Sequence, residues 1–248
     1  MNILALDSSA EILSVALAAG EGVWHFEVDN GKRHSELMME CIDMLFKSAG
    51  LLPAELNVAA CMKGPGSFTG LRIGFSTAKG LSMALGIPLV SIPTLDCLAW
   101  HLSAWPGIVI PSMDSKNECF FTALYFKGIC LTGFLDTSPE LISLEIEKIR
   151  AQGSIPCEKI SISDPVDTPV ENISKNEPII LTGPGAELMK ERIEEHIPGD
   201  QIKIDPEFGM GRAKELIKIV KKDILYKAND IDSGPLYLRK SDAELKLE

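Results

Sequence analysis

The sequence repeats part of itself at a spacing of 107 residues. An apolar strand over residues 3–6 runs into an acidic turn at 7–11 (DSSAE), and residues 108–110 lead in the same way into 114–118 (DSKNE). Five of the eleven positions from Asp7 to Leu17 are identical in the second copy. A repeat of this kind indicates a chain built from two copies of one supersecondary unit, which restricts the fold more than any single motif does.

A second repeated unit follows in the same order in both halves. An apolar strand over 58–62 enters Gly-Pro-Gly at 64–66 and then a helical pattern, and 179–181 enters Gly-Pro-Gly at 183–185 in the same way. Gly-Pro turns are common, so one such match alone could be coincidence. Because two features recur in one order, we interpret the chain as a duplication.

Each half is therefore predicted to contain three antiparallel strands, a helix, a strand that ends in the glycine turn, and another helix. The third strands are expected at 23–28 and 129–134. The apolar spacing predicts helices over 35–49, where Gly50 occupies the C′ position, and over 139–149.

An amphipathic helix is predicted over 212–227, with Leu216, Val220 and Ile224 facing inward. Its polar face is basic, and we interpret it as a solvated face rather than a binding patch. The members of that face are Arg212, Lys214, Lys218, Lys221, Lys222 and Lys227. The segment 153–178 is rich in Pro, Ser, Asp and Asn and is expected to be irregular.

The charge balance limits what the chain can bind by itself. It carries 35 acidic against 24 basic residues, a net charge of -11, and such a field repels phosphate backbones. If the function involves RNA, we expect a partner to supply the contacts. No apolar run approaches the ~20 residues of a membrane helix, and the N-terminus lacks the basic flank of a signal peptide. We expect no membrane partner, a cytoplasmic location and reduced, mostly buried cysteines.

The segment 64–74 (GPGSFTGLRIG) lies between a predicted strand and a predicted helix, where free backbone N–H groups suit an anion. It is not a P-loop, since Leu71 and Arg72 stand where Lys and Ser or Thr are required. A dinucleotide fingerprint also fails, because Thr69 occupies the third glycine position and no carboxylate ends the next strand. The candidate anion or nucleotide contacts that remain are Asp7, Ser8, Gly66 and Ser67.

Small residues recur at every fourth position along the helix that follows this turn. Glycine inside a helix costs about 0.5–1 kcal/mol relative to alanine, so Gly70 and Gly74 indicate that something approaches the helix closely. One interpretation is a neighbouring helix of the same chain. The other is a partner's helix, received by this helix and by the methionine-rich helix 35–49. In the second case the contact residues are Leu37, Met38, Cys41, Gly70, Ile73, Gly74, Thr77 and Ala78.

Side chains suited to catalysis are sparse. No two histidines are three or four residues apart, so a zinc protease is excluded and a histidine metal site is disfavoured. No Gly-x-Ser-x-Gly elbow is present to mark a serine nucleophile. The acids of the two repeated turns could hold a metal between the halves, although such acids more often hydrogen-bond their own loops. We assign no catalytic residue and no metal ligand.

Several segments together resemble the TsaB (YeaZ) family. They are the first strand with Asp7, the unbroken segment 64–74, the Pro-Thr-Leu step at 93–95, Asp114 with Glu118, and 235–239 (PLYLR). The resemblance implies a duplicated actin-like α/β fold of the ASKHA, ribonuclease H-like type, with two lobes of mixed sheet flanked by helices. The expected lobes are 1–104, completed by a helix over 208–230, and the smaller 105–207.

The resemblance also implies a role. Members pair with the catalytic TsaD subunit and, with the small ATPase TsaE, support transfer of threonylcarbamoyl to N6 of the tRNA adenosine beside the anticodon. This chain would then be a non-catalytic scaffold or activator that contacts tRNA only indirectly and has no cofactor of its own. Family contacts use two helices that map onto 35–49 and 69–85, and homodimers form through the same surface. ATP or ADP at the partner interface stays an open alternative.

Two departures from related patterns bear on nucleotide binding. Actin-like ATPases carry a glycine in the first turn, where this chain has Ser8 and Ser9, and this disfavours independent ATP binding. The family's Asp-Ala-Arg turn in the second lobe reads Asp-Ser-Lys at 114–116, so any contact of that arginine would be either lost or taken over by Lys116. A stand-alone actin-like ATPase or kinase is the alternative function.

Overall fold

A computed structural model gives the structure, and it describes residues 1–29, 33–155, 170–171, 173–174, 176–198, 201–222 and 230–239. The chain divides into two compact units. The first comprises Met1–Cys97 and Gly211–Glu248, and the second comprises Leu98–Met210. The sequence-based division set these boundaries at 104/105 and 207/208.

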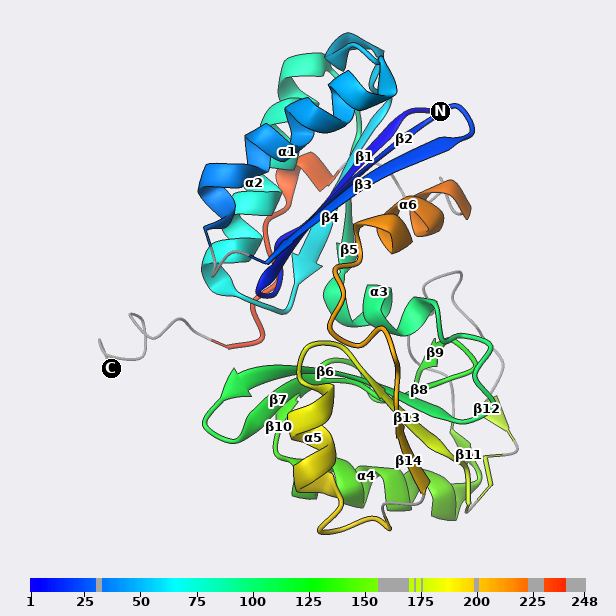
Figure 1. The fold of residues 1–248 in the computed structure, drawn as a ribbon. Coiled ribbons are helices and arrows are strands. Elements are labelled where there is room, and N and C mark those ends of the chain that lie inside the picture. The colour runs from blue at the N-terminus through cyan, green and yellow to red at the C-terminus, as the bar shows by residue number, and fades with distance from the viewer. Residues whose placement is uncertain are drawn as a thin grey trace. The chain divides into compact units, whose positions relative to one another are not determined.

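The first unit contains a five-stranded sheet in the order β3-β2-β1-β4-β5 (Figure 1). Its strands are β1 (Ile3–Asp7), β2 (Ile12–Ala19), β3 (Gly22–Asp29), β4 (Val58–Gly64) and β5 (Leu89–Pro93). The pairs β1–β2 and β2–β3 are antiparallel, whereas β1–β4 and β4–β5 are parallel. All five residues of β1 are buried, as expected for a central strand covered on both faces.

Helices cover both faces of this sheet. The helices α1 (His34–Ala49) and α2 (Phe68–Leu85) lie on one face, and α6 (Ala213–Lys222) lies on the other (Figure 1). Gly50 ends α1 at a φ of 63°, in the left-handed region, as its position in the sequence indicates. Two short 3-10 helices, η1 (Pro53–Glu55) and η3 (Asp230–Asp232), also belong to this unit, and α3 (Thr94–Trp100) spans the boundary between the units.

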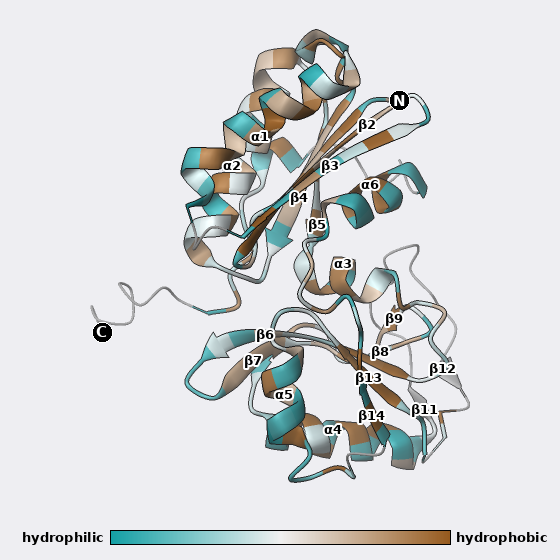
Figure 2. Cartoon of the chain, viewed as in Figure 1, coloured by the Kyte–Doolittle hydropathy of each residue, from teal (hydrophilic) through white to brown (hydrophobic). Residues whose placement is uncertain are grey.

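The amphipathic character of α6 is visible in Figure 2, where brown and teal alternate along the helix. Leu216 and Val220 are buried, as predicted, and Ile224 and Lys227 lie outside the described residues. One member of the predicted solvated face is placed differently. Arg212 directly precedes the helix and is only 1% exposed, and its backbone N–H donates to the side chain of Asp7 at the end of β1.

The second unit repeats the topology of the first. Its main sheet path has the order β10-β7-β6-β13-β14, and the strand directions match those of the first sheet position by position. The strands are β6 (Ile108–Lys116), β7 (Cys119–Thr122), β10 (Leu135–Thr137), β13 (Ile179–Thr182) and β14 (Ile202–Ile204). The duplication predicted from the repeat is therefore confirmed.

The third strand of this second copy is not where the sequence pattern places it. The predicted stretch 129–134 instead begins with β9 (Ile129–Cys130), which forms a small antiparallel pair with β8 (Tyr125–Phe126). Gly133, at a φ of 74°, lies between this pair and β10, which takes the third-strand position. The chain therefore inserts a short hairpin before it returns to the sheet.

The remaining described elements of the second unit are α4 (Pro139–Gln152), α5 (Ala186–Ile193) and the antiparallel pair β11 (Ser154–Ile155) and β12 (Val170–Glu171). Most of the segment predicted to be irregular, including Cys157, lies outside the described residues. The five described cysteines are free thiols, and four of them are buried. Over the part of the chain that is described, no helix is long and apolar enough to cross a membrane.

Candidate functional site

Asp7, at the end of β1, is held by groups of its own chain. Ser9 donates its backbone N–H and its Oγ to Asp7 Oδ1, at 3.0 and 2.7 Å. The backbone N–H of Arg212 donates to Asp7 Oδ2 at 2.9 Å. The carboxylate is buried; its Oδ1 closes the first turn, and its Oδ2 fixes the start of α6 to the sheet.

The next residue, Ser8, explains the glycines of α2. Its Oγ donates to the carbonyl of Gly70 at 2.8 Å. A Cβ on Gly70 would come within 3.0 Å of the Ser8 carbonyl oxygen, and a Cβ on Gly74 would come within 3.0 Å of Ser8 Oγ; real Cβ atoms do not approach so closely. These two glycines are buried against the first turn of their own chain, so the close approach that their spacing predicts is made within this unit.

Other members of the predicted partner surface are also buried in the chain itself. Met38, Cys41 and Ala78 belong to the hydrophobic core that α1 and α2 form with the first sheet, because they lie on the faces that cover its strands. Their side chains are thus used by the core of their own unit. Leu37, Ile73 and Thr77 keep partial exposure, so the prediction stands untested for them.

Large apolar side chains do project from the same two helices into solvent. Met39 and Met44 of α1 are 55% and 51% exposed, and Met83 of α2 is 65% exposed. Methionine side chains are flexible and adapt to varied partners, so exposed methionines on two neighbouring helices suit a contact surface. We refer to Leu37, Met39, Met44, Ile73, Thr77 and Met83 as the α1–α2 face.

The candidate anion contacts Gly66 and Ser67 also serve the first turn. The Ser67 N–H donates to the Ser9 carbonyl at 2.7 Å, and Ser67 Oγ accepts from Gly70 N–H at 3.3 Å as the N-cap of α2. A Cβ on Gly66 would lie 2.6 Å from the Ser9 carbonyl oxygen. The glycine turn and the first turn are therefore packed directly on each other.

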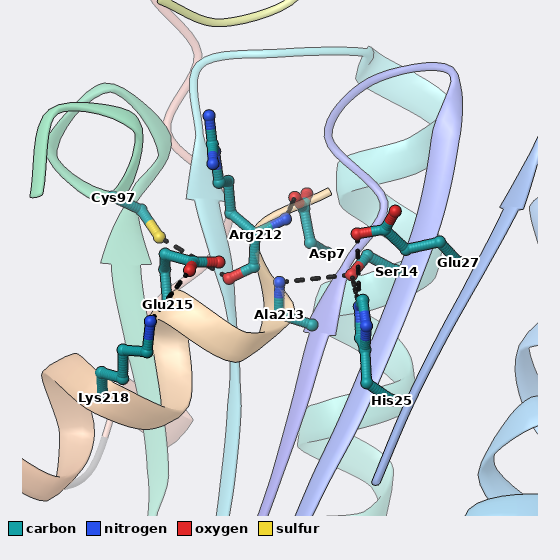
Figure 3. A network of polar contacts seen from close by, with 9 residues as sticks. All are labelled: Asp7, Ser14, His25, Glu27, Cys97, Arg212, Ala213, Glu215 and Lys218. Carbon is teal, nitrogen blue, oxygen red and sulfur yellow. Dashed lines mark hydrogen bonds and ion pairs between the residues drawn. The ribbon is translucent and has the colours of Figure 1, made fainter. Parts of the chain in front are cut away.

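A polar network that the sequence analysis missed surrounds the start of α6 (Figure 3). The Sγ of Cys97 points at the Arg212 carbonyl at 3.9 Å, and burial raises the pKa of this thiol well above its ordinary value. Glu215 is 5% exposed, and Lys218 Nζ lies 3.3 Å from its Oε1. The Cys97 contact binds the start of α6 to the rest of the first unit, whereas the Glu215–Lys218 pair lies within the helix itself.

Ser14, His25 and Glu27 in the same network bring together the residue types of a hydrolytic triad (Figure 3). Ser14 Oγ and Glu27 Oε1 lie 2.9 and 3.3 Å from the same ring nitrogen, Nε2 of His25. A triad requires the acid on the opposite nitrogen. Ser14 is fully buried, and its Oγ accepts from the Ala213 N–H at 3.3 Å. The group therefore anchors α6 and has no nucleophile accessible to a substrate.

Burial shapes the ionisation of this group. It lowers the pKa of His25, with the charge of Lys214 acting in the same direction. It raises the pKa of Glu27. Both effects favour neutral side chains, since a low-dielectric site penalises the charged form. Residues 25 and 27 alternate on one strand, a pattern that looks like ordinary sheet surface in the sequence.

The acidic turn of the second unit is closed in a similar manner. Asp114 accepts from the backbone N–H and the Nζ of Lys116, at 2.8 and 3.0 Å. Burial tends to raise the pKa of Asp114, but these bonds outweigh it and the pKa is lowered. Lys116, Asn117 and Glu118 all have positive φ, at 73°, 54° and 62°. Glu118 pairs with Arg192 at 3.0 Å, so both acids of this turn contact cations of their own chain.

A second buried carboxylate fixes the end of β13. Asp205 Oδ2 accepts from Thr182 Oγ1 at 2.7 Å and lies 2.8 Å from His101 Nε2. The backbone N–H of Glu207 donates to Oδ1 at 3.1 Å. Burial would raise the pKa of Asp205, but these partners outweigh it and hold the pKa well below its usual range. Among the described residues, no group of three or more His, Cys, Asp or Glu side chains could hold a metal ion.

The two mixed sheets share one strand order, and in each of them one strand leads into a glycine turn and a helix. This arrangement defines the class of proteins with a duplicated actin-like fold. A structure described as YeaZ from Pseudomonas aeruginosa has a similar fold, with a TM-score of 0.70 at 18% identity over 96% of this chain and 99% of that one. At this identity the likeness shows the fold alone.

The family can be assigned from sequence. The model described as "TsaD: tRNA N6-adenosine threonylcarbamoyltransferase" matches residues 28–246, most of the chain. The TsaB protein of Bacillus subtilis is 33% identical over 126 residues, 50% of this chain and 55% of the relative. That of Escherichia coli is 35% identical over 100 residues, 40% and 43% of the two chains. The chain spans about half the length of the curated relatives it matches. The chain belongs to this family and, within it, to the TsaB (YeaZ) proteins.

Proposed function

We propose that the chain is a non-catalytic subunit in tRNA threonylcarbamoyladenosine biosynthesis. It pairs with a TsaD-like catalytic subunit and works with a TsaE-like ATPase in threonylcarbamoyl transfer to the tRNA adenosine beside the anticodon. The relatives from B. subtilis and E. coli carry the name "tRNA threonylcarbamoyladenosine biosynthesis protein TsaB", and this supports the pathway.

One observation carries the choice of a scaffold over a stand-alone actin-like ATPase or kinase. The first turn, where an actin-like ATPase receives phosphate on backbone N–H groups, is filled by the chain itself. The Ser9 N–H is donated to Asp7, and the Ser8 side chain is wedged against α2. A phosphate would have to displace these buried bonds, and each donor or acceptor left unpaired costs about 1–3 kcal/mol.

The α1–α2 face is the proposed contact surface for the partner. Its exposed methionines gain by being buried, at roughly 25 cal/mol for each Å² of apolar surface removed from water. With a net charge of -11, the chain is poorly suited to hold tRNA, so RNA contacts belong to the partner. The chain needs no cofactor of its own in this proposal, and ATP or ADP shared at the interface is left for the assay to decide.

The test is reconstitution. A TsaD-like subunit, a TsaE-like ATPase, tRNA, ATP and the threonylcarbamoyl precursors are combined with and without this chain, and modified adenosine is measured. We expect modification to depend on the chain. A chain that leaves modification unchanged refutes the proposal, and ATP hydrolysis by the chain alone that survives repurification favours the ATPase alternative.

Two substitutions test whether the α1–α2 face is the contact surface. Met44→Asp and Met83→Asp place a charge where burial is proposed, so pairing should weaken by about tenfold or more while the melting temperature holds. Leu144→Asp is the matched control, because Leu144 of α4 in the second unit is 54% exposed. If all three variants pair alike, the α1–α2 face is not the contact surface.

A further inference from the structure

Arg72 is held in one orientation on the exposed side of α2. Its guanidinium carbon lies 3.8 Å from the centre of the Phe68 ring, one helical turn earlier. Its Nε donates to the hydroxyl of Tyr237 at 3.1 Å. The rings of Phe68 and Tyr237 are themselves 4.7 Å apart. Stacking and a hydrogen bond together fix a side chain that would otherwise sample many rotamers.

The segment that supplies Tyr237 is itself fastened to the first sheet. The Leu236 N–H donates to the carbonyl of Lys63 at the end of β4, at 2.6 Å. Asp230 accepts from the Ser91 backbone N–H on β5 at 2.8 Å and lies 3.7 Å from Lys63 Nζ. Tyr237 is therefore a fixed support for the guanidinium and not a loose terminal side chain.

The two terminal nitrogens of Arg72 have no partner among the described residues, and the side chain is exposed. Other surface arginines behave differently, since Arg33 lies against Glu36 and Arg192 lies against Glu118. In a chain with 35 acidic residues, a clamped arginine without a carboxylate is conspicuous. A guanidinium offers parallel donors that fit a carboxylate or a phosphate in a bidentate manner.

We infer that Arg72 is a preorganised anchor for a carboxylate presented by the protein partner that binds the α1–α2 face. This inference rests on the proposed function, and it names the chemistry of that partner's contact. Arg72 lies on the same helix as Ile73, Thr77 and Met83, one residue from the nearest of them. A carboxylate fits better than an RNA phosphate, because the net charge of -11 disfavours a polyanion at this surface. Since Phe68 and Tyr237 fix the orientation beforehand, little side-chain entropy remains to be lost on binding.

The experiment measures pairing of the full chain with the TsaD-like subunit by calorimetry, for wild type and four variants. Arg72→Ala should weaken pairing roughly ten- to a hundredfold. Arg72→Lys should restore only part of this, because an ammonium keeps the charge without the planar fork. Tyr237→Phe keeps the ring but removes the hydroxyl that holds Nε, so a loss of a few-fold is expected. Arg192→Ala changes the net charge equally in the second unit and should stay within about threefold of wild type.

The outcomes separate the inference from the proposed function. If Arg72→Ala pairs as well as Arg192→Ala, the inference is overturned and the proposed function stands. If Arg72→Ala pairs normally but the assembled complex binds tRNA less well, the anion is a phosphate and the inference is wrong. A wild-type chain that does not pair overturns both. Circular dichroism melts accompany each variant, and a loss of pairing that merely tracks a loss of fold counts against the anchor.

Discussion

The contact between the first turn and α2 can be tested with two glycines of one helix. Gly70→Ala places a methyl group against the Ser8 carbonyl oxygen, a backbone atom that cannot rotate away. Gly80→Ala, ten residues further along, adds the same methyl group where nothing lies within 4 Å. Both substitutions add one methyl group to α2, at the buried Gly70 in its first turn and at the exposed Gly80 in its interior. The decisive difference is the neighbour that the methyl group meets.

The expected magnitudes follow from that difference. Overpacking costs about 1–3 kcal/mol, and a backbone neighbour argues for the upper end of that range. Alanine in place of glycine returns about 1 kcal/mol of helix propensity. Gly70→Ala should therefore lower the free energy of unfolding by about 2 kcal/mol, whereas Gly80→Ala should raise it by about 1 kcal/mol. For a chain of this length, each kcal/mol shifts the melting temperature by about 2–4 °C.

Thermal melts followed by circular dichroism measure both variants beside the wild type. We expect Gly70→Ala to melt about 4–8 °C lower and Gly80→Ala about 2–4 °C higher. If Gly70→Ala were as stable as Gly80→Ala, then Ser8 would not lie against the helix. The explanation of the small-residue stripe as an internal contact would then fail.

Two further predictions concern buried polar contacts. In Gly74→Ala the new Cβ clashes with Ser8 Oγ, whereas the Ser8 Cβ lies at an ordinary contact distance of 3.7 Å. Ser8→Ala removes that Oγ, so the double variant should lose about 1 kcal/mol less unfolding free energy than the sum of the two single variants. Urea unfolding measures this coupling, and strictly additive losses would contradict it. Asp205→Asn weakens the bonds to His101 and Thr182 and should cost about 1–3 kcal/mol at pH 7. Folding lowers the pKa of Asp205, so the ionised carboxylate stabilises the folded state. The difference in unfolding free energy between wild type and Asp205→Asn should therefore be largest above the ordinary carboxyl pKa of about 4 and should decrease as the pH falls below it. A stability difference between the two proteins that does not change with pH would contradict this prediction.

The duplicated sheets could be predicted because each copy has the same local signals in the same order. An apolar strand ending in Asp7 or Asp114 and a strand ending in a glycine turn are short-range features. The third strand of the second copy could not be placed in this way. The inserted strands β8 and β9 have two residues each, too few to show any periodicity.

The side of α2 that packs against the rest of the unit could not be predicted from the sequence, for a geometric reason. Gly70 and Gly74 share their four-residue spacing with Ser76, Gly80 and Ala84, so either set could face a neighbour closely. The structure buries the first set against the first turn and exposes the second. Spacing defines a stripe on a helix but does not say which side of the helix meets the sheet.

The burial of Arg212 shows that contacts between residues far apart in the chain cannot be predicted from a local sequence pattern. A basic residue at the start of a helix with several lysines indicates solvent exposure. Its burial depends on Asp7, which is 205 residues away in the chain. No local pattern connects the two positions, because the link exists only once the last helix packs on the first sheet.

The discontinuity of the first unit also sets the order in which the protein can be completed on the ribosome. Residues 1–97 emerge first, but the sheet face covered by α6 stays bare until residues 213–222 have been synthesised. The β5 edge likewise waits for Asp230, close to the end of the chain. The second unit is continuous and has all its residues once 210 has emerged. The first unit thus begins before the second and is completed after it, and the sheet face that α6 covers stays exposed to solvent until residues 213–222 follow.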